Sequence, residues 1–314
     1  MDKTKRGIAL FITLLVIASI LSIVAVSFSY LEKVQKDAGK VSSLIQGNLL
    51  YKNTTEILKK FFPKGKADSK KLQMIYSLPL MIEEPKSGFS INLDCKPLLV
   101  GVPINWLDES FDKNITQKFE LAKKVLSYII EKYEIEEPNR LEEFILGAVT
   151  GRVEYEREYK PRLEPRKGIS SKKQFDKIIL DYRMRYDDTK VFKVPWDRYF
   201  VFVDVTKRAT IDGEYITPEL ISASFDIPLE SVKDEWKPNL SLSTDNIDMQ
   251  EDKRTLQDYL LDNGVEGFDK RLFSKKALNV MHCQERYSYR DLFYSFSFDY
   301  SEGRSKNFEF NGEI

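Results

Sequence analysis

The chain has 314 residues, enough for one large domain or two of ordinary size with a well-buried core. Its 49 basic residues match its 49 acidic residues, so no overall positive field favours nucleic acid binding. Charged residues make up 31% of the chain, which is typical of a polar globular body. The exception to this composition is one strongly apolar segment near the N-terminus.

That segment is long enough to cross a membrane. The 21 residues from Ile8 to Phe28 carry no formal charge, and as a helix they span roughly 30 Å, the thickness of a bilayer's hydrocarbon core. A cleaved export signal has a shorter apolar region and ends in small residues, which the segment 27–30 (SFSY) does not provide. Lys3, Lys5 and Arg6 predict a cytoplasmic N-terminus with the body on the other side of the membrane.

The apolar pattern continues beyond this segment with the period of a helix. Apolar residues recur at steps of three and four, the spacing of one helix face: Leu31, Val34, Ala38, Val41, Ile45 and Leu49. Charged residues occupy the other faces: Lys33, Lys36, Asp37 and Lys40. Because no proline follows until Pro63, we expect a single helix from about Ile8 to Lys60, half in lipid and half packed on a soluble domain.

The middle of the chain alternates a strand with helices. Residues 88–94 (GFSINLD) have the composition of a strand. One face of a following helix is apolar: Phe119, Ala122, Leu126, Ile129 and Tyr133. Residues 141–149 predict a second short helix, and the acidic and aromatic segment 154–182 passes through Pro161 and Pro165 into a helix that starts near Ser171.

The next segments predict a strand and a pair of short helices. Residues 196–205 are rich in aromatic and β-branched residues and predict a strand with Tyr199, Val201, Val203 and Val205 on one side. Helices are expected to begin at Pro218, where Thr217 is a natural cap, and at Pro228. The pair lacks the glycine and the basic face that a nucleic-acid-binding helix pair needs.

The C-terminal segment predicts a β-hairpin with one buried aromatic face. Aromatic residues alternate with polar ones through the first strand, as Tyr294, Phe296, Phe298 and Tyr300. Residues 301–304 (SEGR) supply a turn, and Phe308 and Phe310 continue the alternation. We expect one face of this hairpin to be packed and the other to face solvent.

The sequence contains few candidate catalytic residues. The one histidine, His282, stands beside Cys283, but adjacent residues on a strand face opposite ways and no second histidine exists to complete a zinc site or a triad. The sequence contains no G-x-S-x-G, H-E-x-x-H, P-loop or G-x-G-x-x-G motif. We therefore expect structural roles for both residues and no enzymatic activity.

Two further features leave alternatives open. Cys95 and Cys283 are the only cysteines, and in an oxidising compartment they either form a disulfide or remain buried as small core residues. Asp245, Asp248, Glu251 and Asp252 form an acidic cluster. Such a cluster either binds calcium, which prefers oxygen ligands, or is a solvated helix start.

The N-terminal pattern resembles type IV pilins and the pseudopilins of type II secretion systems. It combines a short basic leader ending in Gly7, a long apolar helix and an amphipathic continuation. The resemblance implies that a prepilin peptidase cuts between Gly7 and Ile8 and methylates the new N-terminus. The apolar helix would then stay in the mature chain, first as an anchor and later in a filament core.

Further features resemble the K-type minor pseudopilins of that family. Most members have a glutamate four residues after the new N-terminus, where this chain has Ile12. K-type subunits lack that acid, because a tip subunit has no neighbour above it to supply a cation for a buried carboxylate. They are also large, since a mostly helical domain interrupts their fold, and segments 88–94 and 154–182 match that plan in order and character. The K-type subtype is reported to bind calcium, but its site does not align with the acidic cluster.

The resemblance implies an α+β fold. A long N-terminal transmembrane and amphipathic helix would pack on an antiparallel, pilin-like sheet, with a mostly helical domain inserted. In such a fold the C-terminal hairpin would lie across the N-terminal helix and bury Ile45 and Leu49. We expect a prepilin leader at 1–7, a transmembrane helix at 8–28, the rest of the helix and the first part of the pilin-like domain at 29–100, the inserted domain at 101–195, and further helices with the C-terminal strands at 196–314.

The function implied is that of a minor pseudopilin at the tip of a secretion pseudopilus, anchored in the inner membrane with its body in the periplasm. Its partners would be other minor pseudopilins, the major pseudopilin, the prepilin peptidase and secreted proteins, with no nucleic acid. Two alternatives remain: a minor pilin of a type IV pilus, and a signal-anchored periplasmic enzyme or binding protein whose leader resembles a pilin's by chance.

Overall fold

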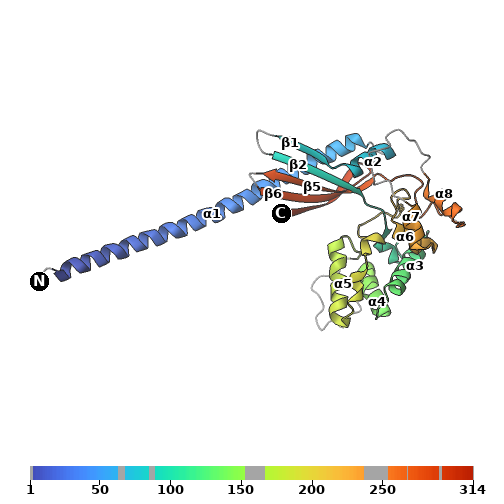
Figure 1. The fold of residues 1–314 in the computed structure, drawn as a ribbon, viewed down its shortest axis with the longest axis horizontal. Helices are drawn as coiled ribbons and strands as arrows, with labels where there is room; N and C mark the ends of the chain where they lie inside the picture. The colour runs from blue at the N-terminus through green and yellow to red at the C-terminus, as the bar shows by residue number, and fades with distance from the viewer. Residues whose placement is uncertain are drawn as a thin grey trace.

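The computed structural model describes residues 3–62, 68–84, 89–152, 167–236, 254–266, 268–289 and 292–313. Figure 1 shows a long helical rod that ends against a β-sheet, and a group of helices beside that sheet. We call the sheet with the two helices packed on it the sheet unit, and the group of helices the helical unit. The chain therefore has the α+β fold that the sequence predicted.

The rod is a single helix, α1, from Lys3 to Phe61. Its C-terminal end is followed by a short helix, α2 (Ser69–Ser77), whose first turn is capped by the Asp68 side chain. The continuous helix that the sequence predicted from Ile8 to Lys60 lies within α1. No proline occurs in this span, so nothing interrupts its hydrogen-bond ladder.

The sheet unit holds a five-stranded antiparallel sheet in the order β1-β2-β5-β6-β7. Its strands are β1 (Leu80–Glu84), β2 (Phe89–Pro97), β5 (Val280–Tyr289), β6 (Leu292–Ser301) and β7 (Arg304–Glu313). β2 and β5 are neighbours in the sheet although 182 residues separate Pro97 from Val280 in the sequence. All of the helical unit is therefore inserted between two adjacent strands.

The C-terminal hairpin is confirmed as β6 and β7. Glu302 and Gly303 both have positive φ, at 50° and 81°, which is the backbone of the tight turns that match the twist of paired strands. The alternating aromatic residues of β6 are all buried: Tyr294, Phe296, Phe298 and Tyr300. Aromatic side chains carry much buried area each, so this face is the main apolar surface of the sheet.

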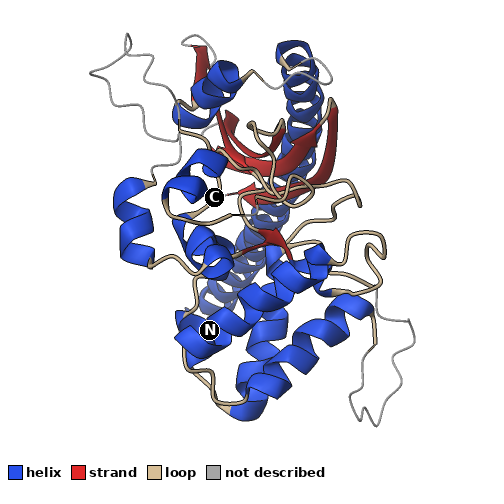
Figure 2. Cartoon of the chain, turned by 90° about the vertical axis from the view of Figure 1, so that its right-hand side faces the viewer, coloured by secondary structure: helices blue, strands red, loops and turns tan. Residues whose placement is uncertain are grey.

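The helical unit contains six α-helices, three 3-10 turns and one short parallel strand pair among the described residues. Its elements are β3 (Val102–Pro103), η1 (Ile104–Leu107), α3 (Gln117–Lys132), α4 (Pro138–Thr150), α5 (Lys172–Tyr186), η2 (Lys190–Lys193), η3 (Trp196–Arg198), β4 (Phe200–Val201), α6 (Pro218–Phe225), α7 (Leu229–Glu235) and α8 (Leu256–Asp262). Figure 2 shows these helices gathered below the curved sheet. Their shared apolar core runs from Val102 to Phe273, so the boundary predicted at residue 195 falls inside it.

The caps of two helices in this unit agree with the sequence. The Ser171 hydroxyl accepts a hydrogen bond from the N–H of Gln174 at the start of α5, and Thr217 does the same for Leu220 at the start of α6. Each hydroxyl satisfies a backbone donor that has no partner within its own helix.

The strand predicted at 196–205 is wrong in length. Only Phe200 and Val201 form a strand, which pairs in parallel with Val102 and Pro103. Four consecutive residues, 199–202, are buried, so the segment does not alternate between two faces. Pro103 has no N–H to continue the ladder, and the aromatic residues of the segment are buried among helices instead.

A buried carboxylate joins the two units. Asp212 accepts hydrogen bonds from the N–H groups of Glu214 and Tyr215 in its own loop, and from the N–H of Leu278 just before β5, at 2.9, 3.3 and 2.7 Å. Burial raises the pKa of this carboxyl to about 7. Because it bonds to both segments, Asp212 fixes the point where the chain leaves the helical unit and enters the sheet.

Candidate assembly surface on the N-terminal helix

The N-terminal part of α1 is an exposed apolar rod. Its described side chains from Thr13 onward have a mean hydropathy of 2.4 in the most apolar stretch, and none of that stretch is buried by the rest of the chain. By length and composition this helix could cross a membrane. The processing positions Gly7 and Ile8, and the position of Ile12, lie within the backbone of α1.

Hydroxyl groups within the apolar stretch form their hydrogen bonds inside the helix. Ser19, Ser22 and Ser27 each donate a hydrogen bond to the carbonyl four residues earlier, at 2.8, 2.9 and 2.8 Å. An unpaired hydroxyl is costly in an apolar medium, and this back-bonding removes the cost without an external partner. The serines are therefore compatible with lipid around the rod.

One face of the second half of α1 is docked on the sheet. The docked residues follow helical spacing and are Ser43, Gly47, Leu50, Tyr51, Thr54 and Leu58. The Tyr51 hydroxyl donates to Ser305 of β7 at 2.7 Å, and the Tyr287 hydroxyl of β5 donates to the carbonyl of Ser43 at 2.5 Å. The Tyr51 ring lies 5.2 Å from that of Phe298 and 4.7 Å from that of Phe308. Both hydrogen bonds and aromatic contacts thus hold the rod on the sheet.

Gly47 allows the helix to approach the sheet closely. A Cβ atom at this position would lie 3.0 Å from the Tyr287 hydroxyl and 3.4 Å from the Phe310 ring. Gly39, in the same helix, has nothing within 4 Å of the corresponding point. The two glycines therefore form a matched pair, one at a contact and one in open space.

We expect Gly47→Val to weaken the docking of α1 by about 1–3 kcal/mol, since the added methyl groups would overlap Tyr287 and Phe310. Gly39→Val should change the stability by less than about 1 kcal/mol, because only helix propensity differs there. Hydrogen exchange of the backbone amides in α1 and β5 of the full chain measures both. Equal protection in the two variants would contradict a close contact at Gly47.

The apolar stripe predicted from the sequence lies on the opposite face of α1. At about 100° per residue, the stripe of Leu31, Val34, Ala38, Val41, Ile45 and Leu49 is centred roughly 160° from Gly47. Ile45 is 56% exposed and Leu49 is 52% exposed, so the expectation that the hairpin buries them is wrong. We call these six residues the outer stripe. It continues the apolar surface of the rod along the face that the sheet leaves free.

The outer stripe is free of charge although charged residues lie close by in the sequence. Lys33, Lys36 and Lys40 fall within roughly 40° of the Gly47 direction, on the face that the sheet occupies further along the helix. α1 thus has a docked face and a separate apolar face. One contacts the sheet of its own chain, and the other has no contact within the described residues.

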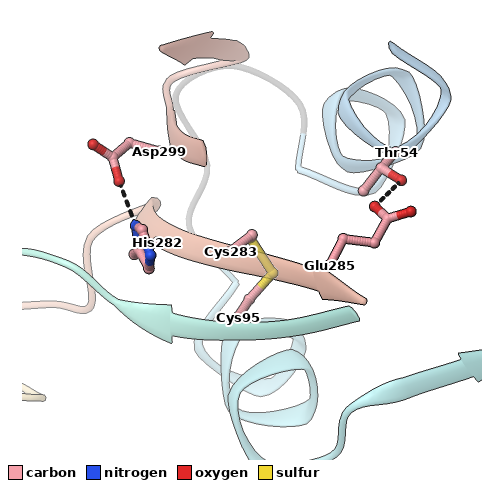
Figure 3. Close-up of a disulfide and its surroundings, with 6 residues drawn as sticks. All are labelled: Thr54, Cys95, His282, Cys283, Glu285 and Asp299. Atoms are coloured by element: carbon pink, nitrogen blue, oxygen red, sulfur yellow. Dashed lines mark hydrogen bonds and ion pairs between the residues drawn. A yellow bond between two sulfur atoms is a disulfide. The ribbon is translucent and has the colours of Figure 1, made fainter. Parts of the chain in front are cut away.

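A disulfide joins Cys95 of β2 to Cys283 of β5, directly across the strand pair (Figure 3). Both residues are fully buried in the core between the sheet and the helices α1 and α2. Of the two alternatives left by the sequence, the structure has the bridged pair. The bond closes the base of the loop of chain that contains the whole helical unit.

Two residues further along β5, Glu285 is buried beneath α1. Its Oε2 accepts a hydrogen bond from the Thr54 hydroxyl at 2.7 Å, and its Oε1 is buried without a partner among the described residues (Figure 3). Burial raises the pKa of this carboxyl to about 7. The contact between rod and sheet therefore includes one group that titrates near neutral pH.

His282 contacts Asp299 of the neighbouring strand β6. It is exposed on the sheet face opposite Cys283, with its Nδ1 2.7 Å from Asp299 (Figure 3). Asp299 also accepts a hydrogen bond from Asn307. Since Cys283 is bonded to Cys95, the His282–Cys283 pair supplies no nucleophile.

The described part of the chain has no cluster of metal-ligating side chains. Within those residues no three His, Cys, Asp or Glu side chains are placed to hold an ion together. The acidic cluster considered for calcium, residues 245–252, lies outside the described residues.

No known family model matches the sequence, and no curated protein matches it either. The fold is similar to that of a chain in the crystal structure of the GspK–GspI–GspJ complex from the type 2 secretion system of enterotoxigenic Escherichia coli. The two are 11% identical, with a TM-score of 0.50, and the match covers 87% of this chain and 98% of the other. The likeness concerns the fold, and it includes most of both chains. This chain therefore shares an α+β fold with that chain, built here on a long apolar N-terminal helix and an antiparallel sheet.

Proposed function

We propose that this chain is a K-type minor pseudopilin, which assembles with other minor pseudopilins at the tip of a type II secretion pseudopilus. The observation that carries the proposal is the outer stripe of α1. An apolar helix face diametrically opposite a docked face needs a partner, because water-exposed apolar surface of this length is unfavourable. Helices of other subunits that run beside α1 would cover it.

Three other observations support this assignment. The fold is similar to a chain from a type 2 secretion system complex that contains three Gsp proteins. The helical unit is inserted between β2 and β5, which agrees with the interrupted fold of K-type subunits. The apolar residue at position 12 suits a subunit that has no neighbour above it.

In this proposal the residues 8–28 hold the chain in the inner membrane, with the sheet and helical units in the periplasm. The prepilin peptidase removes residues 1–7, and the new N-terminus at Ile8 is methylated. The body then associates with the other minor pseudopilins, the major pseudopilin and the proteins to be secreted. The function is performed by packing of α1, the sheet unit and the helical unit against the corresponding parts of other subunits, and the chain catalyses no reaction.

The first test is the N-terminus of the full chain extracted from its own cell's membranes. We expect a start at Ile8 with N-methylation, by mass spectrometry of the N-terminal peptide. Gly7→Ala should leave the chain starting at Met1, whereas the matched variant Gly39→Ala should be processed normally. An intact Met1 in the unaltered chain would refute the assignment to pilin-like proteins.

The second test places a charge on the outer stripe. Ile45→Glu should leave the fold intact, because the side chain is exposed within the chain, but would bury a carboxylate wherever another helix packs. We expect at least a tenfold lower recovery of other pilin-like subunits with the full chain from detergent extracts. Lys36→Glu makes a larger change of charge on the opposite face and should have little effect. Equal recovery with both variants would contradict packing through the outer stripe.

A further inference from the structure

The helical unit carries an exposed apolar patch formed by Leu180, Met184 and Phe192, which we call the α5 patch. The exposed fractions of these side chains are 46%, 70% and 54%. Leu180 and Met184 are one helical turn apart, and the Arg183 guanidinium joins Met184 to Phe192. Its Nη1 lies 3.8 Å from the Met184 sulfur, and its carbon lies 5.8 Å from the centre of the Phe192 ring. The patch is therefore continuous across α5 and η2.

α5 has two distinct faces. Its inner face, with Phe175, Ile179 and Tyr182, is buried in the core of the helical unit. At about 100° per residue, Lys173, Lys177, Leu180 and Met184 share the opposite face within roughly 60°. A helix already buried on one side needs no apolar residues on the other for its own stability. Exposed methionine and arginine together are typical of contact surfaces between proteins.

The charges around the patch favour an acidic partner. Lys173, Lys177 and Lys193 form no ion pair with a carboxylate of the described residues, while Lys172 is paired with Asp176. The described segment 172–193 contains seven basic and four acidic residues, so positive charge is in excess along it. A complementary surface would present carboxylates around an apolar centre.

The place of the patch in the molecule indicates which partner this is. In Figure 1, α5 is on the side of the helical unit that faces back toward the N-terminal end of α1, and α3 is on the far side. If the α1 helices of several subunits pack side by side, the sheet and helical units of the next subunit toward the membrane lie on that side. We infer that the α5 patch docks an acidic and apolar surface on the head of a neighbouring pilin-like subunit. This inference rests on the proposed function.

Cross-linking in the intact membrane tests the inference. A photo-reactive phenylalanine analogue is placed at position 184, at the matched exposed position 123 of α3, and at position 34 of the outer stripe. We expect position 184 to form an adduct with another pilin-like subunit of the same cell, and position 123 to form none. Leu180→Glu combined with Phe192→Glu should reduce the adduct from position 184 at least tenfold. Lys177→Glu should reduce it too, and Lys177→Arg should not.

The outcomes separate the two proposals. Adducts from position 34 without any from position 184 would overturn the α5 contact and leave the proposed function standing. No pilin-like adduct from either position would contradict both. Adducts of position 184 with lipid only, or with a secreted protein only, would also overturn the inference. Trp106, Trp196 and Trp236 are buried in the helical unit, so unchanged tryptophan fluorescence verifies that each variant still folds.

Discussion

Replacing Cys95 and Cys283 together by alanine is expected to lower the free energy of unfolding of the sheet unit by about 5 kcal/mol. The estimate follows from the chain entropy that a bond between residues 188 apart removes from the unfolded chain. The cost is large because the insertion is long. β2 and β5 pair although the whole helical unit separates them in the sequence, and the disulfide keeps them together in the unfolded chain.

The measurement has to report on the sheet rather than on the helices. The three tryptophans all lie in the core of the helical unit, so their fluorescence follows that unit. Hydrogen exchange of the amides of β2, β5 and β6 in the full chain follows the sheet. We expect faster exchange in all three strands of the double variant, and the same effect when the unaltered chain is treated with a reductant.

A matched control makes the result specific to the bond. Ala277→Gly removes one methyl group from the same buried core without altering a crosslink, and should cost about 1 kcal/mol. If the double variant and this control lost the same protection, the disulfide would contribute no more than its packing, and the loop-closure argument would be contradicted.

The sequence predicted those elements whose pattern is local. The hairpin of β6 and β7 was predicted from alternating aromatic residues and a turn, and α1 was predicted from a proline-free helical period. Ser171 and Thr217 marked the starts of α5 and α6, because a capping hydroxyl acts within three residues. Each of these signals is contained in a few neighbouring residues.

The candidate site depends on contacts between distant residues, and here the sequence predicted less. The helical period located the outer stripe correctly but not the side of α1 that the sheet would cover. The docked face includes Ser43, Gly47 and Thr54, whose small or polar side chains do not suggest a buried helix face. Their role follows from the shape of the sheet opposite them, which no local pattern encodes. Similarly, residues 196–205 have strand composition, but in the fold only two of them pair with another strand, the two-residue β3.

Glu285 shows the same limit and leads to the second large effect. In the sequence it is one carboxylate among 49 acidic residues, and only the structure buries it under α1 against Thr54. The group on α1 that contacts it is a neutral hydroxyl. On the same face of β5, the titratable neighbour is Tyr287, whose pKa is raised to about 12 by burial, by Tyr294 and by Glu285 itself. No positive charge of the described residues compensates the carboxylate, so its ionised form is disfavoured in the folded chain.

The direction of the pH dependence follows from this raised pKa. The carboxyl titrates near 4.5 in the unfolded chain and at about 7 in the folded chain. Below pH 4.5 both states are protonated, and the contribution of this group to stability is fully present. As the pH rises to 7 the unfolded state releases its proton first, and the folded state loses about 3 kcal/mol relative to it. Above pH 7 no further change is expected from Glu285.

Glu285→Gln removes this titration while it keeps the shape of the side chain. We expect the variant to be more stable than the unaltered chain by up to about 3 kcal/mol at pH 8, and nearly equal to it at pH 4.5. Hydrogen exchange of β5 and of residues 43–61 in α1, compared between variant and unaltered chain at each pH, gives the difference. That comparison cancels the titration of Asp212, whose pKa is also raised to about 7. Glu309→Gln, at an exposed position of β7, should show no such divergence. If Glu285→Gln and Glu309→Gln behaved alike at pH 8, the carboxylate would have to be hydrated in the folded chain, and α1 would have to leave the sheet at that point.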